Sequence, residues 1–266
     1  AKNGLKSCRI TPDLDASQFL FEPTFYATDE PMTLRIVVKD GQKIVFKKEV
    51  RASNSSKIIA PIKKVKTWSP ESPFLYDVEY SDIDAKGNIA DHVTAYAGMR
   101  KSELRNGVFY LNNEPYYQRL VLDQGFYPDG IYTAPTKEAL KQDIEMSMKV
   151  GFNGARLHQK IFEPQFLCEC DRRGYIVWGE HANWGLDISR PGAYGNFVPE
   201  WVEAVERDFN HPAIIGWCPL NETQENQNPD FVRALAAITR TLDPTRAYID
   251  ASGWTHVDGV SDITDM

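Results

Sequence analysis

The residue of this chain best placed to do chemistry is a carboxylic acid at the end of an apolar run. The run Ile214 to Leu220 ends in Asn221-Glu222-Thr223. An unbroken apolar run is typical of a strand buried on both faces, and α/β enzymes place catalytic groups at the carboxyl ends of such strands. Trp217 offers an apolar wall that would raise the pKa of Glu222. We therefore expect Glu222 to act as a general acid.

Polar side chains also follow the other apolar runs of the second half of the chain. In chain order they are Asp123, then Arg156 and His158, then Glu180 and His181, and finally Asp250, Ser252 and Trp254. Polar groups gathered at the same end of successive parallel strands are what the active-site face of a (β/α)₈ barrel requires. The turn after the first run, residues 123–130, matches neither GxGxxG nor a P-loop, so no phosphate site is indicated.

Helical patterns separate these runs. Thr136 is a predicted N-cap, Pro164 opens a second helix, residues 196–209 form a third, and Asn228-Pro229 starts a fourth that ends at Leu242. A further strand is expected to begin at Asp262-Ile263-Thr264. Strands that alternate with helices of this length predict βαβ units on a parallel sheet. The domain from residue 102 to 266 is therefore expected to be barrel-like.

The first hundred residues have a different pattern. Apolar and polar residues alternate through residues 33–39, and Asp40-Gly41 is a hairpin signal before the next apolar residues. Further strand-like runs occupy residues 57–62, 74–80 and 92–97. Six or seven short strands with a turn about every ten residues predict an immunoglobulin-like β-sandwich over residues 1–101.

Composition limits the classes of function. The 266 residues carry a net charge of −7 with no long basic run, so nucleic acid is not an expected partner. No apolar stretch has transmembrane length, and no metal-ligand spacing or cofactor motif is present. The four cysteines are expected to be free thiols. The chain starts like a cut inside a longer protein, which leaves open a removed signal peptide and a periplasmic or secreted location.

Several stretches together resemble glycoside hydrolase family 2, the β-galactosidase, β-glucuronidase and β-mannosidase group. They are residues 68–76 (WSPESPFLY), 98–101 (GMRK), 151–158 (GFNGARLH) and 208–212 (DFNHP), with Trp217 and Asn221-Glu222. The resemblance extends from about residue 10 to the end. It implies a β-sandwich followed by a TIM barrel, and retaining hydrolysis of a β-linked sugar by two carboxylic groups about 5 Å apart.

The resemblance also implies roles for single residues. Glu222 matches the acid/base, Asn221 the residue that binds the sugar 2-hydroxyl, and Arg156 an arginine that orients the nucleophile. Three further candidates for the sugar site are His158, Trp217 and Asp123. Each residue keeps an ordinary structural alternative, such as a helix-start carboxylate for Glu222, a turn residue for Asn221 or an ion-pair partner for Arg156.

The departures from the family are informative too. The usual N-terminal sugar-binding domain is absent, and only residues 101–266 remain for a barrel that usually needs about 250 residues. The nucleophile belongs after the seventh strand, whereas the chain stops in or just after the sixth. We therefore expect a C-terminally truncated barrel from a β-galactosidase that is inactive alone. The alternatives are a non-catalytic carbohydrate-binding fragment and a fragment that self-associates through open barrel edges.

Overall fold

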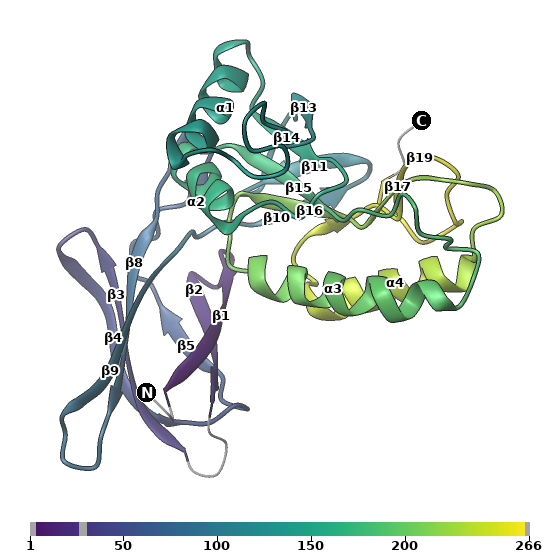
Figure 1. The fold of residues 1–266 in the computed structure, drawn as a ribbon. Helices are drawn as coiled ribbons and strands as arrows, with labels where there is room; N and C mark the ends of the chain where they lie inside the picture. The colour runs from purple at the N-terminus through teal and green to yellow at the C-terminus, as the bar shows by residue number, and fades with distance from the viewer. Residues whose placement is uncertain (1–3, 27–30, 264–266) are drawn as a thin grey trace. The chain divides into compact units, whose positions relative to one another are not determined.

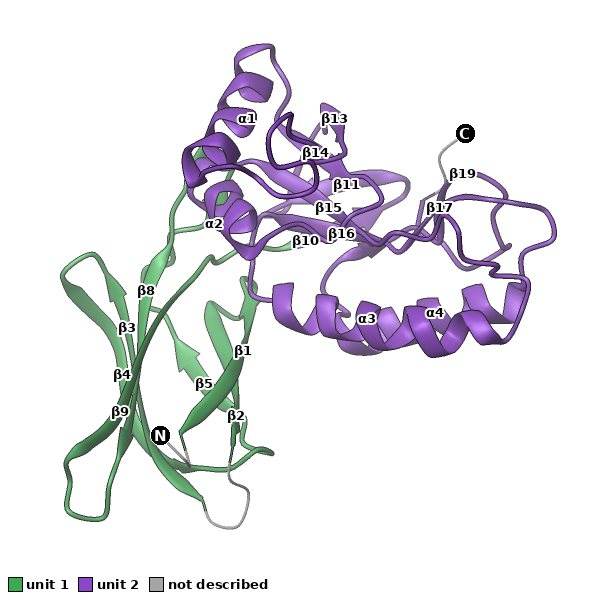
Figure 2. Cartoon of the chain, in the orientation of Figure 1, with its two compact units in different colours: residues 1–101 green, residues 102–266 purple. Residues whose placement is uncertain are grey.

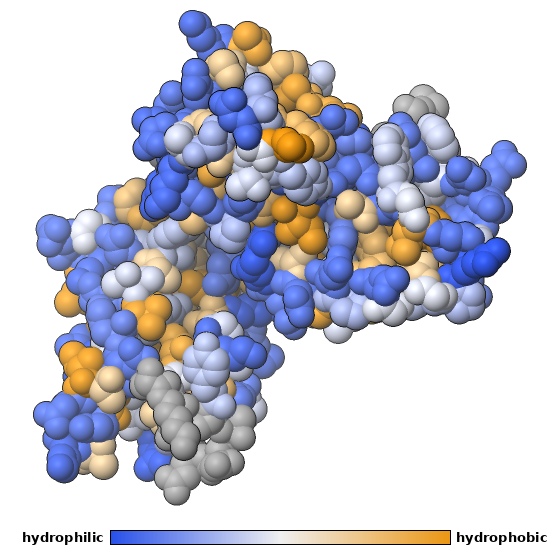
Figure 3. Space-filling view, viewed as in Figure 1, coloured by the Kyte–Doolittle hydropathy of each residue, from blue (hydrophilic) through white to orange (hydrophobic). Residues whose placement is uncertain are grey.

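The computed structural model describes residues 4–26 and 31–263, which form two compact units, Ala1–Lys101 and Ser102–Met266 (Figures 1 and 2). None of the described helices is long and apolar enough to cross a membrane. On the face shown in Figure 3, hydrophilic residues cover most of each unit, and hydrophobic residues gather in small groups rather than in one continuous patch.

Unit 1 is a β-sandwich of two antiparallel sheets. One sheet has the order β1-β2-β5, and the other has the order β4-β3-β8-β9 (Figure 1). The bounds are β1 Leu5–Asp13, β2 Gln18–Phe25, β3 Met32–Asp40, β4 Lys43–Ala52, β5 Ile58–Pro61, β6 Trp68–Ser69, β7 Ser72–Pro73, β8 Tyr76–Ile83 and β9 Ile89–Ala97. Strands β6 and β7 pair as a short separate ribbon. The sandwich predicted from alternating residues is therefore present.

The core of unit 1 comes from one face of each sheet. In β2 every second residue is buried, including Phe19 and Phe21, and in β3 Leu34 and Ile36 are fully buried. Successive side chains of a strand point to opposite faces, so this alternation buries one face and leaves the other to water. Gly41, with a φ of 57°, closes the turn between β3 and β4 that Asp40-Gly41 predicts.

Unit 2 opens with a small antiparallel sheet that the sequence analysis missed. It consists of β10 Ser102–Arg105, β11 Val108–Leu111 and β12 Glu114–Pro115. Asn106-Gly107 connects the first two strands, and Asn112-Asn113 connects the second pair, with positive φ at all four residues. Asn-Gly between short apolar segments is a strong hairpin signal, so the first hairpin was readable from the sequence.

The rest of unit 2 alternates parallel strands with helices. The bounds are β13 Leu120–Asp123, α1 Lys137–Lys149, β14 Gly154–Leu157, α2 Pro164–Arg173, β15 Ile176–Glu180, α3 Gly192–Asp208, β16 Ile214–Cys218, β17 Leu220–Thr223, α4 Pro229–Leu242, β18 Ala247–Tyr248 and β19 Ala251–Trp254. The five-stranded sheet has the order β13-β14-β15-β16-β18, which is the chain order. A doubly wound sheet would reverse this order at a switch point, whereas a TIM-barrel-type sheet does not.

The helices begin and end where the sequence signals lie. The Thr136 side chain accepts a hydrogen bond from the Ala139 amide at the start of α1, and Asn228 caps α4 in the same way. Gly174, with a φ of 70°, ends α2. Helices α3 and α4 lie side by side (Figure 1). Helix α3 begins at Gly192, four residues before the predicted start, and contains Pro199.

The run that ends at Glu222 forms two strands instead of the predicted one. Strand β16 pairs with β15 and β18, but β17 pairs only with β19, and Pro219 lies between β16 and β17. Proline has no amide hydrogen to donate to a strand ladder, which explains the break. Glu222 is consequently the third residue of a second short strand, displaced from the main sheet.

Two tryptophan–glycine pairs fix how β15 and β16 meet. Trp178 lies opposite Gly216, and Gly179 lies opposite Trp217. A Cβ atom at Gly216 would come within 2.2 Å of the Trp178 ring, and one at Gly179 within 2.5 Å of the Trp217 ring. Each large ring therefore fills the space that the facing glycine leaves. Every residue of both strands is buried, as expected for a parallel sheet covered on both faces.

The end of the described chain differs from the prediction. Asp262 and Ile263 are not part of a strand, and Thr264 lies outside the described residues. Asp262 accepts a hydrogen bond from the amide of Tyr248 in β18 and forms an ion pair with Arg240 in α4. Its position is therefore set by these two elements. None of the four cysteines, all of which lie within the described residues, takes part in a disulfide.

Candidate active site

An arginine, a glutamate and an asparagine from strands β14, β15 and β17 are joined by hydrogen bonds. Arg156 Nη1 donates to Glu180 Oε2 at 2.6 Å and to Asn221 Oδ1 at 3.1 Å. The Glu180 side chain is fully buried, and Arg156 is 21% exposed. The buried charge of Glu180 is thus paired, as burial requires. Arg156, Glu180 and Asn221, which are far apart in the sequence, therefore lie in contact with one another.

A second pair of side chains holds the backbone next to Glu222. Asn183 Oδ1 accepts from the Asn221 amide at 2.8 Å, and Asn183 Nδ2 donates to the Asn221 carbonyl at 3.0 Å. Gln159 Nε2 donates to Asn183 Oδ1 at 2.7 Å, and the Gln159 amide donates to Glu180 Oε1 at 2.8 Å. Gln159 and Asn183 could not be predicted from the sequence, because amides in loops after strands carry no pattern of their own.

Two buried polar atoms of this network have no hydrogen-bond partner among the described residues. They are Asn221 Nδ2 and His158 Nδ1. Asn221 is 1% exposed, so its amide hydrogens are shielded from bulk water. Buried donors are nearly always satisfied, and an exception is usually explained by strain, a catalytic role, or a bound water or ion.

His158 lies against the same network. Its Nδ1 atom is 3.3 Å from Glu180 Oε1, and its ring contacts Trp184 edge to face. Burial lowers the pKa of His158, and the charge of Arg156 lowers it further, while Glu222 acts in the opposite direction. At neutral pH this histidine is therefore neutral, with one ring nitrogen able to donate a hydrogen bond and the other able to accept one.

Glu222 has an uncommon backbone conformation. Its φ is 49°, in the left-handed region, and Trp254 on the neighbouring strand β19 has a φ of 66°. Non-glycine residues rarely adopt this region, and their conformation persists only where the surrounding structure fixes it. The Asn183 bonds to Asn221 and the β17–β19 pairing supply that constraint. Strain of this kind is concentrated at functional sites.

Glu222 lines a pocket of about 650 Å³. The pocket lies between the loop after β15 and the strands β17 and β19, and Trp184, Asp187, Gln224, Asn226 and Trp254 contribute to its wall. Its lining contains two carboxylates, Asp187 and Glu222, and no lysine or arginine among the described residues. Its size lies within the range of small-molecule sites.

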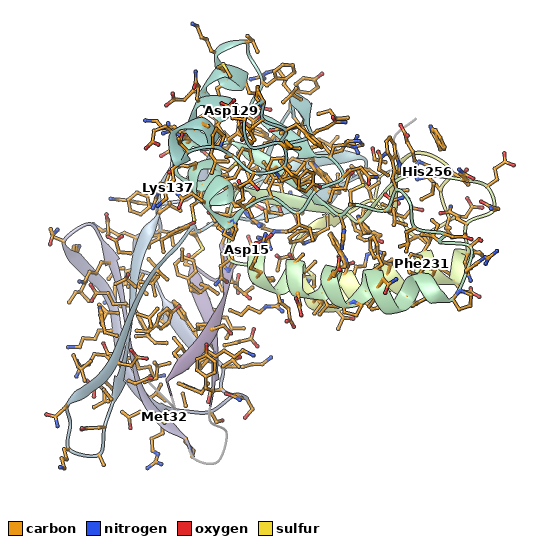
Figure 4. The ribbon with its side chains drawn as sticks, viewed as in Figure 1. Asp15, Met32, Asp129, Lys137, Phe231 and His256 are labelled. Atoms are coloured by element: carbon orange, nitrogen blue, oxygen red, sulfur yellow. The ribbon has the colours of Figure 1, made fainter. Side chains whose placement is uncertain are left out.

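Asp123 lies at the end of β13, as predicted, but its side chain takes part in a different set of contacts. It accepts a hydrogen bond from the Gly125 amide at 2.8 Å. Burial raises the pKa of Asp123, an effect that this bond and the nearby Lys160 oppose and Asp143 reinforces. Lys160 Nζ donates to the carbonyls of Gly125 and Tyr132 and so anchors the loop between β13 and α1. Asp129 and Lys137 mark this connection in Figure 4.

Trp217, which is predicted to help shape the sugar site, packs in the core of unit 2. Trp217 is 2% exposed, and it is not among the residues that line the Glu222 pocket. Its Nε1 atom donates to Asp243 Oδ2 at 2.8 Å, and its ring packs edge to face on Trp201. The break at Pro219 separates β16 from β17, so Trp217 belongs to the core while Glu222 faces the pocket.

The loop after β19 is fixed by one buried aspartate. Asp250 accepts hydrogen bonds from the Ala251 and Val257 amides and from Ser261, and it contacts His256, which is labelled in Figure 4. Burial alone would raise the pKa of Asp250, but the bonds from His256 and Ser261 outweigh it and lower the pKa. Asp250 is therefore a structural residue that positions the segment carrying Trp254.

No group of three or more His, Cys, Asp or Glu side chains within residues 4–26 and 31–263 is arranged to hold a metal ion. His181, which follows Glu180, stacks on Phe197 and lies 3.2 Å from Glu200.

Comparison with known families matches both units. The model for glycosyl hydrolases family 2 matches residues 6–100, and the model for the TIM barrel domain of the same family matches residues 103–265. Among curated relatives, a β-galactosidase of Pseudoalteromonas haloplanktis is 28% identical over 261 residues, which is 89% of this chain and 24% of the relative. The β-galactosidase BgaC of Bifidobacterium adolescentis is 25% identical and covers 96% of this chain and 25% of the relative.

Solved structures share the fold. A β-glucuronidase from Ruminococcus gnavus superposes with a TM-score of 0.86 at 18% identity and covers 99% of this chain and 45% of its own. The Parabacteroides merdae β-glucuronidase gives a TM-score of 0.83 at 18% identity and covers 98% of this chain and 35% of its own. At such identities the likeness concerns the fold alone. The chain spans about a quarter of the length of the curated relatives it matches.

Proposed function

The chain belongs to glycosyl hydrolase family 2, and from this premise we propose that it forms part of a retaining β-glycosidase in which Glu222 is the acid/base residue. Glu222 would protonate the leaving oxygen in the first step and deprotonate water in the second. The observation that carries the proposal is the unpartnered Asn221 amide, buried beside Glu222 and already oriented by Arg156. The Asn221 Nδ2 hydrogens are available to donate hydrogen bonds to a sugar hydroxyl.

Each network residue has a role in this proposal. Asn221 binds the 2-hydroxyl, a contact that strengthens in the transition state. Arg156 and Glu180 hold the Asn221 side chain, and Asn183 holds its backbone. His158 is a neutral hydrogen-bonding group at the edge of the sugar site. Asp123 remains a candidate acceptor for a hydroxyl that reaches the end of β13.

A retaining mechanism needs a second carboxylate about 5 Å from the first. Glu180 is not suited to this role, because it is fully buried and accepts bonds from Arg156 and Gln159. Asp187, the other carboxylate of the pocket, lies in the loop after β15, where it accepts bonds from Ser189 and pairs with Arg190. We therefore propose that the nucleophile is a glutamate beyond Met266 and that these 266 residues alone do not turn over a β-glycoside. Measurable hydrolysis of an aryl β-galactoside by the purified chain would contradict this proposal.

For the substrate we propose a neutral β-linked sugar, a β-galactoside in the first place. A uronate would need a cation for its carboxylate. Arg156 is already bonded to Glu180 and Asn221, and Lys160 is buried against two carbonyls. The relatives named above are β-galactosidases, whereas the named structures are β-glucuronidases. An active enzyme that contains these residues should therefore hydrolyse an aryl β-galactoside faster than the matching glucuronide.

The role of Glu222 is tested by Glu222→Gln in such an enzyme. General acid–base catalysis contributes about 10²–10⁴-fold, so we expect a loss of that size in kcat/KM on an alkyl galactoside, whose leaving group needs protonation. Glu225→Gln, an exposed neighbour, is the control and should leave the rate unchanged. An unchanged rate for Glu222→Gln on the alkyl substrate would remove Glu222 from the mechanism.

We also propose that the chain associates with itself through the two edge strands of its parallel sheet. Strands β13 and β18 each pair with one neighbour in that sheet and so present an edge, which a closed barrel would not have. Size-exclusion chromatography with light scattering should detect a concentration-dependent oligomer. A monomer at all concentrations would contradict this proposal and favour a sheet whose edges are covered.

A further inference from the structure

Two of the six tryptophans are exposed, and both line the pocket that contains Glu222. Trp184 is 60% exposed and Trp254 is 66% exposed. The other four tryptophans are buried: Trp68, Trp178, Trp201 and Trp217. Tryptophan presents the largest apolar surface of any side chain, and two of them around one pocket beside a catalytic candidate indicate a binding role.

Trp184 is held in place although its ring is exposed. Its backbone amide donates to Gln159 Oε1 at 3.2 Å, and its ring meets His158 edge to face with 5.8 Å between centroids. Gln159 and His158 both contact Glu180. The ring is therefore oriented by the same network that orients Asn221, and a ligand that stacks on it pays little ordering entropy.

Trp254 is held by its backbone. Strand β19 pairs it with Thr223, and the next residue, Thr255, exchanges two hydrogen bonds with Thr223, at 3.3 and 2.6 Å. These contacts keep Trp254 at a φ of 66°, which is rare for a bulky residue. A strained residue that carries an exposed ring next to Glu222 is better explained by ligand contact than by packing, because it contributes little to the core.

We propose that Trp184 and Trp254 form a stacking site for the pyranose ring of the leaving sugar. The inference rests on the proposed role of Glu222, since a general acid contacts the leaving oxygen and the groups around it face the leaving group. A pyranose has apolar C–H faces and a rim of hydroxyls. The two indole rings match the faces, and the exposed amides of Gln224 and Asn226 in the same pocket match the rim. An aromatic leaving group would match only the indoles.

The test is a binding measurement on the 266-residue chain and does not depend on turnover. Acrylamide quenching reports exposed tryptophans, and the probe is lactose. We expect lactose to reduce acrylamide quenching of the wild-type tryptophan fluorescence in a saturable way. Sorbitol, an acyclic polyol without a flat face, should not reduce the quenching. Trp184→Ala and Trp254→Asn should each weaken lactose binding about tenfold. Asparagine tolerates the positive φ at position 254. Each variant keeps one exposed reporter tryptophan.

Tyr117→Ala is the matched control, because Tyr117 is 79% exposed and lies outside the pocket. It should bind lactose like the wild type. Equal affinity of both tryptophan variants and the wild type would overturn the inference, and so would equal protection by sorbitol. Protection by phenol without protection by lactose would also overturn it, in favour of an aromatic leaving group. Glu222→Gln should still bind lactose, so a failure of the acid/base proposal would appear in hydrolysis and not in this assay.

Discussion

At the level of single residues, Asn183 is the side chain that does most to shape the site. It bonds both backbone groups of Asn221, and it is 5% exposed. The residue after Asn221 is Glu222, whose φ is positive. A side chain that satisfies both the amide and the carbonyl of one residue fixes the chain direction there, so Asn183 determines where the Glu222 carboxyl lies.

Replacing Asn183 should therefore damage stability and site geometry together. Asn183→Ala leaves the buried Asn221 amide and carbonyl without partners, which costs about 1–3 kcal/mol for each group. Urea unfolding should show this loss in the isolated chain. Asn226→Ala, an exposed asparagine of the same pocket, is the control and should change stability by less than about 0.5 kcal/mol. Equal stability of the two variants would contradict the role given to Asn183.

The sequence was informative about the residues of the site in an uneven way. Arg156, Asn221 and Glu222 lie at strand ends, and parallel strands bring those ends together, so their proximity could be predicted. Gln159 and Asn183 act through loop contacts that no periodic pattern encodes. Trp217 is predicted for the sugar site from its place beside Glu222 and from the family resemblance. The break between strands β16 and β17 at Pro219 could not be predicted from these signals, and it leaves the Trp217 ring packed in the core.

At the level of elements, the contact of β15 with β16 depends on glycine at two positions. Gly216→Ala would place a methyl group 2.2 Å from the Trp178 ring, and that ring is 4% exposed and bonded to Gln118 through Nε1. Neither the ring nor the backbone can move away without losing contacts. We expect a loss of at least about 1–3 kcal/mol in stability.

Gly195→Ala is a control that should raise stability, whereas Gly216→Ala should lower it. Gly195 lies inside helix α3, and a Cβ atom there would meet nothing within 4 Å. Alanine is the better helix former by about 1 kcal/mol, so this variant should be more stable than the wild type. Thermal unfolding of the two variants compares them directly. A Gly216→Ala chain as stable as Gly195→Ala would show that the strands adjust freely.

A buried ion pair fastens α4 and β18 to the end of α3. Arg246 bonds Asp243 at 2.5 Å and also donates to the carbonyls of Phe209, His211 and Ile214. Burial alone would raise the pKa of Asp243, but Arg246, Thr245 and Trp217 outweigh this effect and hold the pKa at about 2. The folded state thus favours the ionised form of Asp243 more than the unfolded state does.

This lowered pKa predicts a specific loss of stability in acid. The contribution of Asp243 is fully present above its unfolded pKa of 3.8 and disappears as the pH falls through about 2. The shift corresponds to about 2 kcal/mol. Asp243→Asn leaves Arg246 without its counter-charge and should cost about 3–5 kcal/mol at pH 7. The difference from the wild type should shrink in urea titrations between pH 5 and pH 2.

Asp258→Asn, at an exposed position, should follow the wild type at every pH. A constant difference between the wild type and Asp243→Asn across this range would contradict the pKa assignment.

The elements themselves were largely readable from local signals. Thr136, Gly174 and Asn228 end or begin their helices as expected, because capping is a property of a few adjacent residues. Strands β1 and β2 were not identified individually. The predicted strand is absent at Asp262 and Ile263, and Asp262 instead bonds to Arg240 of α4 and Tyr248 of β18. At Asp262, contacts with residues distant in the sequence determine the backbone conformation rather than the local sequence pattern.

At the level of the whole molecule, a β-sandwich is followed by a TIM-barrel-type domain, and each unit has its own core. Strand order in the second unit follows the chain order, which distinguishes it from a doubly wound sheet. This order could be anticipated from the polar groups at successive strand ends. The proposed active site uses the carboxyl ends of several of these strands.

Trapping the glycosyl-enzyme is the direct test of whether Glu222 is the acid/base of the proposed two-step reaction. In an active enzyme containing these residues, Glu222→Gln should still form the intermediate from a 2,4-dinitrophenyl galactoside, whose leaving group needs no proton. Hydrolysis of that intermediate then lacks its base. Added azide should restore turnover and give the β-galactosyl azide. Turnover that azide does not change, with galactose as the only product, would contradict this role of Glu222.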